Sequence, residues 1–210
     1  MFRRKNISSK NYHIRVDYGK KVEKCIIEQL RFIGHTIIDS TEDEDKYDKI
    51  DGYIMIQQQI NPLQIKYRQT GDDILFEVSF MDHASQTMVW DGRDMIGKSS
   101  VYACLSNDGL VIWLCHTFQI KAKADALAKQ LLTLYLKYNQ TSLIDEKGEI
   151  KITQDRESGR RKMLFFAKPS MFSFDTIRLE KSIWSIMKKK SIETIDSLFE
   201  NIPESHYIKI

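Results

Sequence analysis

The chain has few of the residues that characterise disordered or fibrous proteins: only nine glycines and three prolines occur among its 210 residues. It also has ten Phe, nine Tyr and three Trp, a composition that excludes a disordered, collagen-like or linker-rich protein. The length suits one medium domain, or one domain with a small extension. A chain of this size buries about 70% of its unfolded surface, so a folded protein with a sizeable core is expected.

Cysteines are scarce and long apolar runs are missing. The three cysteines, Cys25, Cys104 and Cys115, form no CxxC pair, so we expect buried thiols in a reducing cytosol instead of disulfides or a zinc site. The basic N-terminus precedes no apolar segment, and the longest apolar run, residues 110–115, is far shorter than the roughly 18 residues of a membrane span. A cytoplasmic protein without a membrane partner is the expectation.

Several catalytic signatures are also missing from the sequence. It contains no GxGxxG fingerprint, no phosphate-binding P-loop and no HExxH helix, which argues against nucleotide-binding and zinc-protease functions. It has no Gly-x-Ser-x-Gly either, so an α/β-hydrolase would lack its nucleophile turn.

Charge is nearly balanced overall but separated along the chain. The 32 basic and 29 acidic residues give a net charge of +3, which by itself decides nothing about nucleic acid. Residues 39–51 hold seven acids and two lysines, a balance of −5, whereas residues 151–190 hold eleven basic residues and four acids, a balance of +7. An ordinary solvated face and a phosphate-contacting patch both fit the basic segment, and its clustering favours the patch.

Hydrophobic periodicity predicts a helix, several strands and a second helix before residue 140. An apolar stripe at helical spacing predicts a helix over residues 17–32. Short apolar runs predict strands over 35–39, 53–56, 63–67, 74–80, 100–105 and 110–116, with a turn at Asn61-Pro62 and a hairpin turn at residues 106–109. An Ala- and Leu-rich stretch predicts a helix over 122–138. This order is typical of an α/β or α+β core.

The last seventy residues differ in composition and are assigned to a separate extension. Residues 150–153 and 163–167 are expected to pair as a hairpin, followed by helices over 176–189 and 191–199. We therefore predict a core over residues 1–140 and a small, basic α+β extension over residues 141–210.

Four polar residues in the core form a candidate metal site. Asp51 begins one predicted strand, and Gln64 and Lys66 lie on the same face of the next because residues i and i+2 of a strand point the same way. Asp51, Gln64 and the Ile65 carbonyl are hard oxygen ligands suited to Mg²⁺, and Lys66 would orient water or stabilise a phosphate. Glu23, at the edge of the apolar stripe of the first helix, would add a second carboxylate.

Ordinary structural roles also remain open for the same residues. Asp51 before Gly52 also suits a turn, Lys66 also suits a solvated strand position, and Glu23 also suits a surface pairing with a neighbouring lysine. Asp48 competes with Asp51 as a metal ligand, but Asp51 directly abuts the strand.

Together, Gly19…Glu23…Leu30…Gly34, Asp51-Gly52-Tyr53-Ile54 and Gln64-Ile65-Lys66 resemble the PD-(D/E)xK nuclease superfamily over roughly residues 15–136. The resemblance implies a restriction-endonuclease-like α/β fold, a mixed β-sheet flanked by helices, and a site of Glu23, Asp51, Gln64 and Lys66 that holds Mg²⁺ or Mn²⁺. Gln64 occupies the family's acidic position, so metal affinity should fall unless Glu23 or Glu77 compensates. Many nucleases of this superfamily pair to cut two strands, so a homodimer is included among the expectations.

The predicted function is a metal-dependent nuclease that hydrolyses phosphodiester bonds in DNA. Nucleic-acid contacts are expected from Tyr67 and Arg68 by stacking and phosphate binding, from Arg93 in a loop, and from Arg160, Arg161 and Lys162 in the basic segment. The alternative is a catalytically degenerate nucleic-acid-binding or assembly protein on the same fold, with Gln64 as the trace of lost activity. A folded interaction module with a solubilising basic tail is a weaker third alternative.

Overall fold

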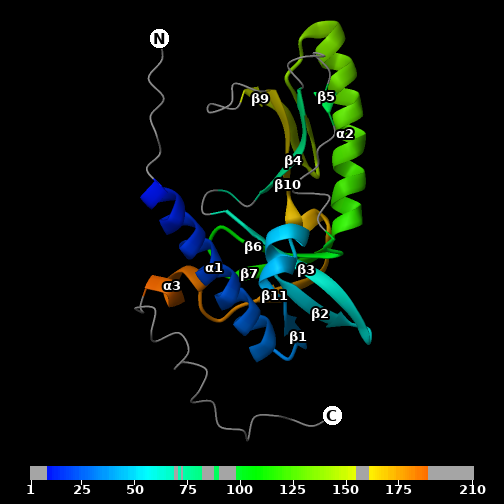
Figure 1. Cartoon of the computed structure of the whole chain (residues 1–210). Helices are drawn as coiled ribbons and strands as arrows, with labels where there is room; N and C mark the ends of the chain where they lie inside the picture. Colours follow the sequence, from blue (N-terminus) through cyan, green and yellow to red (C-terminus); the bar gives the residue numbers. More distant parts are fainter. Residues whose placement is uncertain are drawn as a thin grey trace, which may run out of the picture.

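Two β-sheets and three α-helices make up the computed structural model, which describes residues 9–68, 71, 73–81, 88–89, 98–154 and 161–188 (Figure 1). In chain order the elements are α1 (Ser9–Phe32), β1 (Ile37–Asp39), the π-helical turn η1 (Glu44–Asp48), β2 (Gly52–Ile56), β3 (Gln59–Tyr67), β4 (Ile74–Met81), β5 (Met88–Val89), β6 (Val101–Leu105), β7 (Val111–His116), α2 (Thr117–Tyr138), β8 (Ser142–Asp145), β9 (Gly148–Gln154), β10 (Arg161–Ala167), the 3-10 turn η2 (Pro169–Met171), β11 (Ser173–Arg178) and α3 (Ile183–Lys188).

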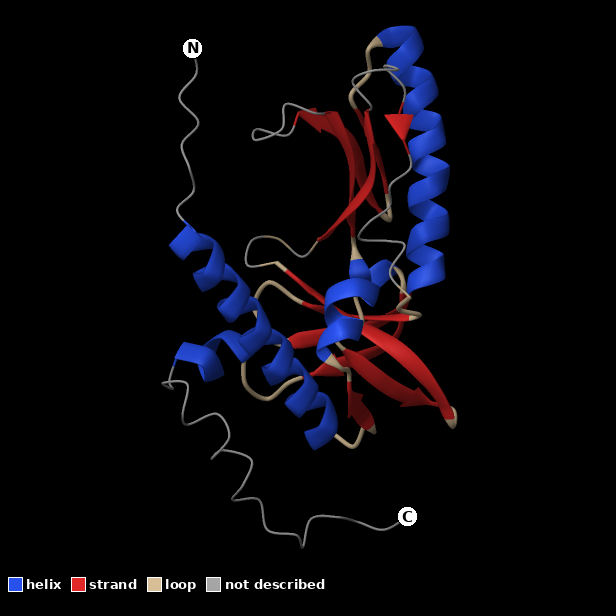
Figure 2. Ribbon diagram, in the orientation of Figure 1, coloured by secondary structure: helices blue, strands red, loops and turns tan. Residues whose placement is uncertain are grey.

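The first sheet has six strands in the order β1-β2-β3-β6-β7-β11, and the second has five in the order β5-β4-β10-β9-β8. β3 and β6 run parallel, and the other neighbouring strands are antiparallel. The chain passes from β3 to β6 by way of β4 and β5 of the second sheet. Figure 2 shows the second sheet with α2 at one end of the molecule and the first sheet with α1 and α3 at the other. A mixed α/β architecture is therefore confirmed.

Helix α1 covers one face of the first sheet because its apolar residues recur at helical spacing. Val22, Ile26 and Leu30 are each 0% exposed and pack with Ile54 and Leu63 of the sheet, and each such side chain contributes about 1.5–3 kcal/mol by leaving water. The predicted helix is confirmed, although it begins earlier, at Ser9.

Helix α1 ends where the sequence predicts. The backbone N–H of His35 donates to the carbonyl of Leu30, and Gly34 adopts a left-handed φ of +99°, an arrangement that satisfies the last carbonyls of a helix and favours glycine.

Helix α2 packs on the second sheet and helps to join the two sheets. Its buried residues, Ile120, Ala124, Leu127, Ala128 and Leu131, share one apolar cluster with side chains from β4, β9 and β10. Tyr102 and Cys104 of β6 belong to the same cluster, so the first sheet contributes one of its faces to this core. None of the described helices has both the length and the apolar composition that crossing a membrane requires.

The hairpin between β2 and β3 turns earlier than predicted. The turn lies at Gln57-Gln58, whose φ angles are +49° and +64°, as a two-residue hairpin with both central residues left-handed requires. The predicted turn at Asn61-Pro62 is wrong, since both residues lie within β3 and pair with Ile54 and Tyr53. Glutamine is an unusual choice for such a turn, whereas Asn-Pro is a strong local turn signal.

The segment after residue 140 joins both sheets. The predicted pairing of residues 150–153 with 163–167 is confirmed as β9 and β10, but β10 also pairs with β4 and β11 pairs with β7. Hydrogen-bonded strand pairs therefore cross the predicted domain boundary. The helix predicted over 176–189 is wrong in its first part, which is strand β11, and α3 begins only at Ile183. The helix predicted over 191–199 lies outside the described residues.

Gly148→Ala is expected to destabilise the protein by about 2–3 kcal/mol, because overpacking forces neighbouring atoms apart. A Cβ at Gly148 would lie 2.3 Å from the Phe166 carbonyl oxygen and 2.9 Å from the Phe165 ring. The control is Gly34→Ala, where φ is +99° but no atom lies within 4 Å of the added carbon, so the loss should stay near 1–2 kcal/mol. Urea unfolding measures both, and equal losses would contradict the steric explanation.

Candidate functional site

Asp51 is held at the start of β2 by the neighbouring strand β3. Its Oδ2 accepts a 2.6 Å hydrogen bond from the backbone N–H of Ile65, and its own N–H donates to the Leu63 carbonyl at 2.9 Å. The carboxylate therefore occupies the place where the ladder between β2 and β3 stops, as the sequence predicts for a residue beside the Gln64-Ile65-Lys66 segment.

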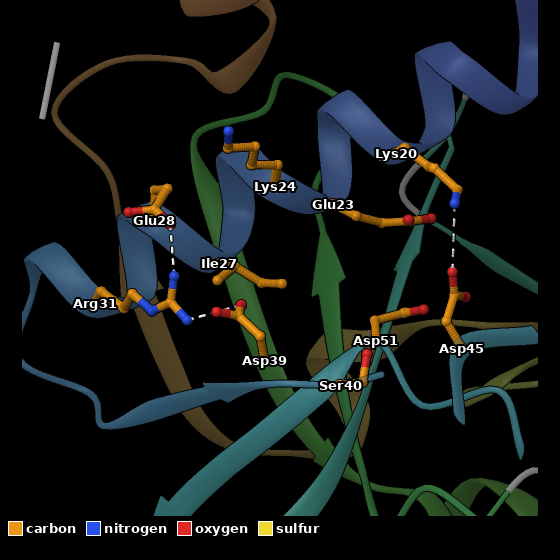
Figure 3. A pocket seen from close by; sticks show the side chains of 10 residues that line it. All are labelled: Lys20, Glu23, Lys24, Ile27, Glu28, Arg31, Asp39, Ser40, Asp45 and Asp51. Atoms are coloured by element: carbon orange, nitrogen blue, oxygen red, sulfur yellow. Dashed lines mark hydrogen bonds and ion pairs between the residues drawn. The ribbon is translucent and has the colours of Figure 1, made fainter. Parts of the chain in front are cut away.

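Glu23 meets Asp51 in a pocket of about 300 Å³ between α1 and the segment that precedes β2. Figure 3 shows the two side chains extending into this pocket from opposite walls. Asp45 of η1 also lines it and forms a 3.8 Å ion pair with Lys20. Glu28, Arg31 and Asp39 close the other end of the pocket, where Arg31 pairs with Glu28 at 2.7 Å and with Asp39 at 2.8 Å.

Both central carboxyl groups resist ionisation. Burial raises the pKa of Glu23 to about 7, and the charges of Asp51 and Asp45 add to the shift, whereas Lys20 and Lys66 oppose it. Burial also raises the pKa of Asp51 to about 6, against the lowering effects of the Ile65 hydrogen bond and Lys66. Desolvation and like charges both disfavour the ionised form, so this pair would ionise more readily with a cation between its members.

Lys66 lies on the opposite face of the first sheet from α1. Its partner in register is Cys104, and its Nζ lies 5.9 Å from the ring centroids of both Phe76 and Tyr102, within the range of cation–π attraction. The lysine charge nevertheless lowers the pKa of both Glu23 and Asp51. The structure thus brings Lys66 within electrostatic range of the carboxylates, although it is absent from the described lining of their pocket.

Gln64 shares the sheet face of Lys66 and is almost fully enclosed, at 6% exposure. Its Oε1 has no hydrogen-bond donor among the described residues. Leaving a buried acceptor unpaired costs about 1–3 kcal/mol. A hydrogen-bond donor or a cation placed at this oxygen would therefore be stabilised here. Like Lys66, Gln64 is not among the described residues that line the pocket of Glu23 and Asp51.

Tyr67 lies beside Glu23 on the α1 side of the sheet, and Gly19 leaves room for it. A Cβ on Gly19 would lie 3.3 Å from the Tyr67 hydroxyl and 3.9 Å from Glu23 Oε1. The ring also lies 6.0 Å from that of Trp184. Burial, with the charge of Glu23, raises the pKa of Tyr67 to about 12, so the hydroxyl stays protonated and able to donate a hydrogen bond.

The other residues predicted to contact nucleic acid have partners within the protein where the structure describes them. Arg68 forms an ion pair with Asp73, Arg161 contacts the Tyr135 hydroxyl, and Lys162 lies 3.0 Å from Glu77. Glu77 belongs to β4 of the second sheet and is not among the described residues that line the pocket of Glu23 and Asp51. Arg93 and Arg160 lie outside the described residues.

Sequence reasoning missed Asp45 and Lys20 as members of the site. In the sequence, residues 39–51 stand out only for their acidic charge, whereas Glu44–Asp48 form a π-helical turn that directs Asp45 toward α1. The five-residue turn leaves no periodic signal in the sequence. Lys20 precedes Glu23 by three residues, a spacing that places both on neighbouring positions of a helix surface.

The donor set fits a hard divalent cation in part. No group of three His, Cys, Asp or Glu side chains within the described segments is arranged to hold a metal ion. Glu23 and Asp51 supply two carboxylates whose ionisation a cation would favour, and Mg²⁺ typically combines one or two carboxylates with water and substrate phosphates. The two carboxylates therefore fit Mg²⁺ or Mn²⁺ without a third acidic ligand.

Comparison of the chain with known protein families, with curated proteins and with solved structures finds no match.

Proposed function

We propose that this protein is a metal-dependent nuclease that hydrolyses phosphodiester bonds in DNA. The observation that carries the proposal is the meeting of Glu23 and Asp51 in one pocket, with the pKa of each carboxyl group raised to about 7 and about 6 and the charge of Lys66 acting on both. Strongly shifted carboxyl groups in a pocket are a common property of catalytic sites.

Each residue of the site has a separate role in this proposal. Glu23 and Asp51 hold the cation, and the Ile65 N–H fixes the orientation of the Asp51 carboxylate. A bound Mg²⁺ or Mn²⁺ supplies Lewis-acid polarisation of the phosphate and a water of lowered pKa. The charge of Lys66 acts on this site from the other face of the sheet, where its ammonium group lies 5.9 Å from the rings of Phe76 and Tyr102, and it favours the ionised form of both carboxyl groups.

The arrangement of the elements supports a restriction-endonuclease-like core as part of the same proposal. Helix α1 packs on a sheet in which the β2–β3 hairpin carries Asp51, Gln64 and Lys66 and β3 runs parallel to β6. The passage from β3 to β6 through the second sheet is a departure from a single central sheet. DNA as the partner and the cytoplasm as the location belong to this proposal as well.

The test is cleavage of plasmid, linear, branched and single-stranded DNA by the purified protein with Mg²⁺, with Mn²⁺ and with EDTA. At least one of these DNA substrates is expected to be cleaved in the presence of Mg²⁺ or Mn²⁺ and to stay intact in the presence of EDTA. Absence of metal-dependent cleavage from every substrate would contradict the proposal.

A binding-only protein is the second candidate, and one observation favours it. Gln64 adds no negative charge, and no third acidic ligand joins Glu23 and Asp51 within the described chain, so metal affinity depends on two carboxylates. Salt-sensitive DNA binding without cleavage under any metal condition would support this candidate and exclude the nuclease.

A further inference from the structure

A second pocket adjoins the site of Glu23 and Asp51 on the side of η1. It has a volume of about 440 Å³ and shares Lys20, Glu23 and Asp45 with the first pocket. Its remaining walls are formed by Gly19, Glu42, Lys46 and Lys49. We call it the η1 pocket. Because Glu23 lines both pockets, a ligand that lies across this residue extends from one pocket into the other.

Gly19 keeps one wall of the η1 pocket open. It lies inside the 24-residue helix α1, where glycine costs about 0.5–1 kcal/mol relative to alanine. A Cβ at this position would lie 3.3 Å from the Tyr67 hydroxyl and 3.9 Å from Glu23 Oε1. The missing side chain therefore leaves a space between these two polar groups, in which a ligand oxygen has a hydrogen-bond donor within reach.

Lys46 and Lys49 bring two ammonium groups to the pocket, and neither forms an ion pair with a carboxylate in the part of the chain that the structure describes. The Lys46 ammonium lies 5.0 Å from the ring centroid of Tyr47, and that of Lys49 donates a 3.3 Å hydrogen bond to the Lys46 carbonyl. An ammonium group has three donors. Both lysines therefore keep N–H groups for a ligand.

The acidic residues of the η1 pocket are largely balanced without these two lysines. Asp45 forms a 3.8 Å ion pair with Lys20 (Figure 3), and Glu23 belongs to the cation site proposed above. Glu42 then remains against two ammonium groups. This excess of positive charge favours an anion as the ligand.

The opposite end of the first pocket has a different charge arrangement. There the Arg31 guanidinium is paired with Glu28 at 2.7 Å and with Asp39 at 2.8 Å, so two carboxylates already occupy it. Successive phosphates of one DNA strand follow each other every ~3.4 Å along the duplex axis. A strand whose scissile phosphate lies at the two central carboxylates must therefore place its next phosphate close by, and the η1 pocket suits that phosphate better than the Arg31 end does.

We infer that the η1 pocket binds the phosphate group that adjoins the scissile one in the DNA strand, with Lys46 and Lys49 as its cations. The Tyr67 hydroxyl donates to the same phosphate across the gap at Gly19. The inference rests on the proposed nuclease function, because it takes the scissile phosphate to lie beside Glu23. Phosphate contacts carry no sequence information, so the pocket fixes the position of the strand and reads no base.

Binding of labelled single-stranded and duplex DNA in EDTA, followed by fluorescence anisotropy at several salt concentrations, tests the inference without cleavage. Each phosphate contact contributes about 0.7 to the slope of log K against log salt for single strands and about 0.9 for duplexes. Lys46→Met and Lys49→Met are each expected to reduce the slope by this amount. Lys137→Met is the matched control, because the exposed Lys137 also holds its Nζ over the ring of the following residue, Tyr138, at 4.9 Å, and its slope should equal that of the wild type.

Gly19→Ala tests the open wall without changing any charge. Alanine favours a helix over glycine, so thermal melting should show a folded variant. Its methyl group is expected to weaken DNA binding about ten-fold, the loss of one hydrogen bond to a charged group. Tyr67→Phe should weaken binding to a similar extent, because it removes the donor and keeps the ring. A folded Gly19→Ala variant that binds DNA like the wild type would overturn the inference.

A wild type that binds neither DNA in EDTA, or slopes that stay unchanged in both lysine variants, would also overturn it. These outcomes are separate from those of the cleavage assay. Metal-dependent cleavage with unchanged slopes would support the nuclease and exclude the phosphate site. Lysine-dependent binding without cleavage under any metal condition would support the phosphate site and contradict the nuclease.

Discussion

Asp51→Asn is expected to lower metal-dependent DNA cleavage by at least about 100-fold, a typical loss when one group that stabilises the transition state is removed. The substitution removes the carboxylate charge that holds the cation, but the asparagine oxygen can still accept the hydrogen bond from Ile65 N–H. The folded structure should therefore survive. Initial cleavage rates with saturating Mg²⁺ or Mn²⁺, compared with thermal melting, measure the two effects separately.

The matched control for this variant is Asp48→Asn. Asp48 lies only three residues earlier, and it competes with Asp51 for the role of ligand on sequence grounds, but it forms a 2.9 Å ion pair with Lys98. Cleavage by Asp48→Asn should stay within a few-fold of the wild type. If Asp48→Asn lost activity while Asp51→Asn kept it, the site would be wrongly assigned.

Lys66→Met extends the same prediction to the other face of the sheet. Methionine keeps an unbranched apolar chain beside Phe76 and Tyr102 but removes the charge, so cleavage should fall as far as in Asp51→Asn. Lys151→Met is the control, because Lys151 is also a strand lysine whose Nζ lies over an aromatic ring, that of Phe166 at 4.3 Å. Retained cleavage in Lys66→Met would remove this residue from the mechanism.

Local patterns were sufficient to predict the elements that carry the site. The apolar spacing of Val22, Ile26 and Leu30 predicts α1, and the hairpin signal at residues 106–109 predicts the connection between β6 and β7; both are confirmed. Asp51 lies beside the Gln64-Ile65-Lys66 segment as predicted, because the order of two consecutive strands leaves few alternatives for their pairing.

The long-range arrangement was not predictable from the same patterns. The sequence suggests one core and a separate extension, whereas β10 pairs with β4 and β11 pairs with β7. Strand pairing over such separations depends on packing between complementary faces, and no local residue pattern records it. The alternation that places Gln64 and Lys66 on the same face is readable from the chain, but which face α1 covers follows only from the packed sheet.

Glu23→Gln is expected to stabilise the protein at pH 8 and to have little effect at pH 4. The pKa of Glu23 is about 7 in the folded protein, above its ordinary value of 4.5, so the folded state binds more protons than the unfolded state between these values. The free energy of unfolding therefore falls as the pH rises through this window. Glutamine never ionises, so the variant should gain about 1–2 kcal/mol over the wild type above pH 7. Urea unfolding at both pH values, with EDTA present, measures the difference.

Glu28→Gln separates this effect from a general response of the pocket. Glu28 lies on the same helix and lines the same pocket, but its carboxylate forms a 2.7 Å ion pair with Arg31, so its replacement should bring no stability at pH 8.

The ionisation of Asp51, whose pKa is about 6, precedes that of Glu23 as the pH rises. The negative charge of Asp51 is one of the causes that raise the pKa of Glu23. Asp51→Asn should therefore reduce the gain from Glu23→Gln when the two are combined. An equal gain at pH 4 and pH 8 would contradict the raised pKa of Glu23, and a fully additive double variant would show that the two carboxylates do not act on one another.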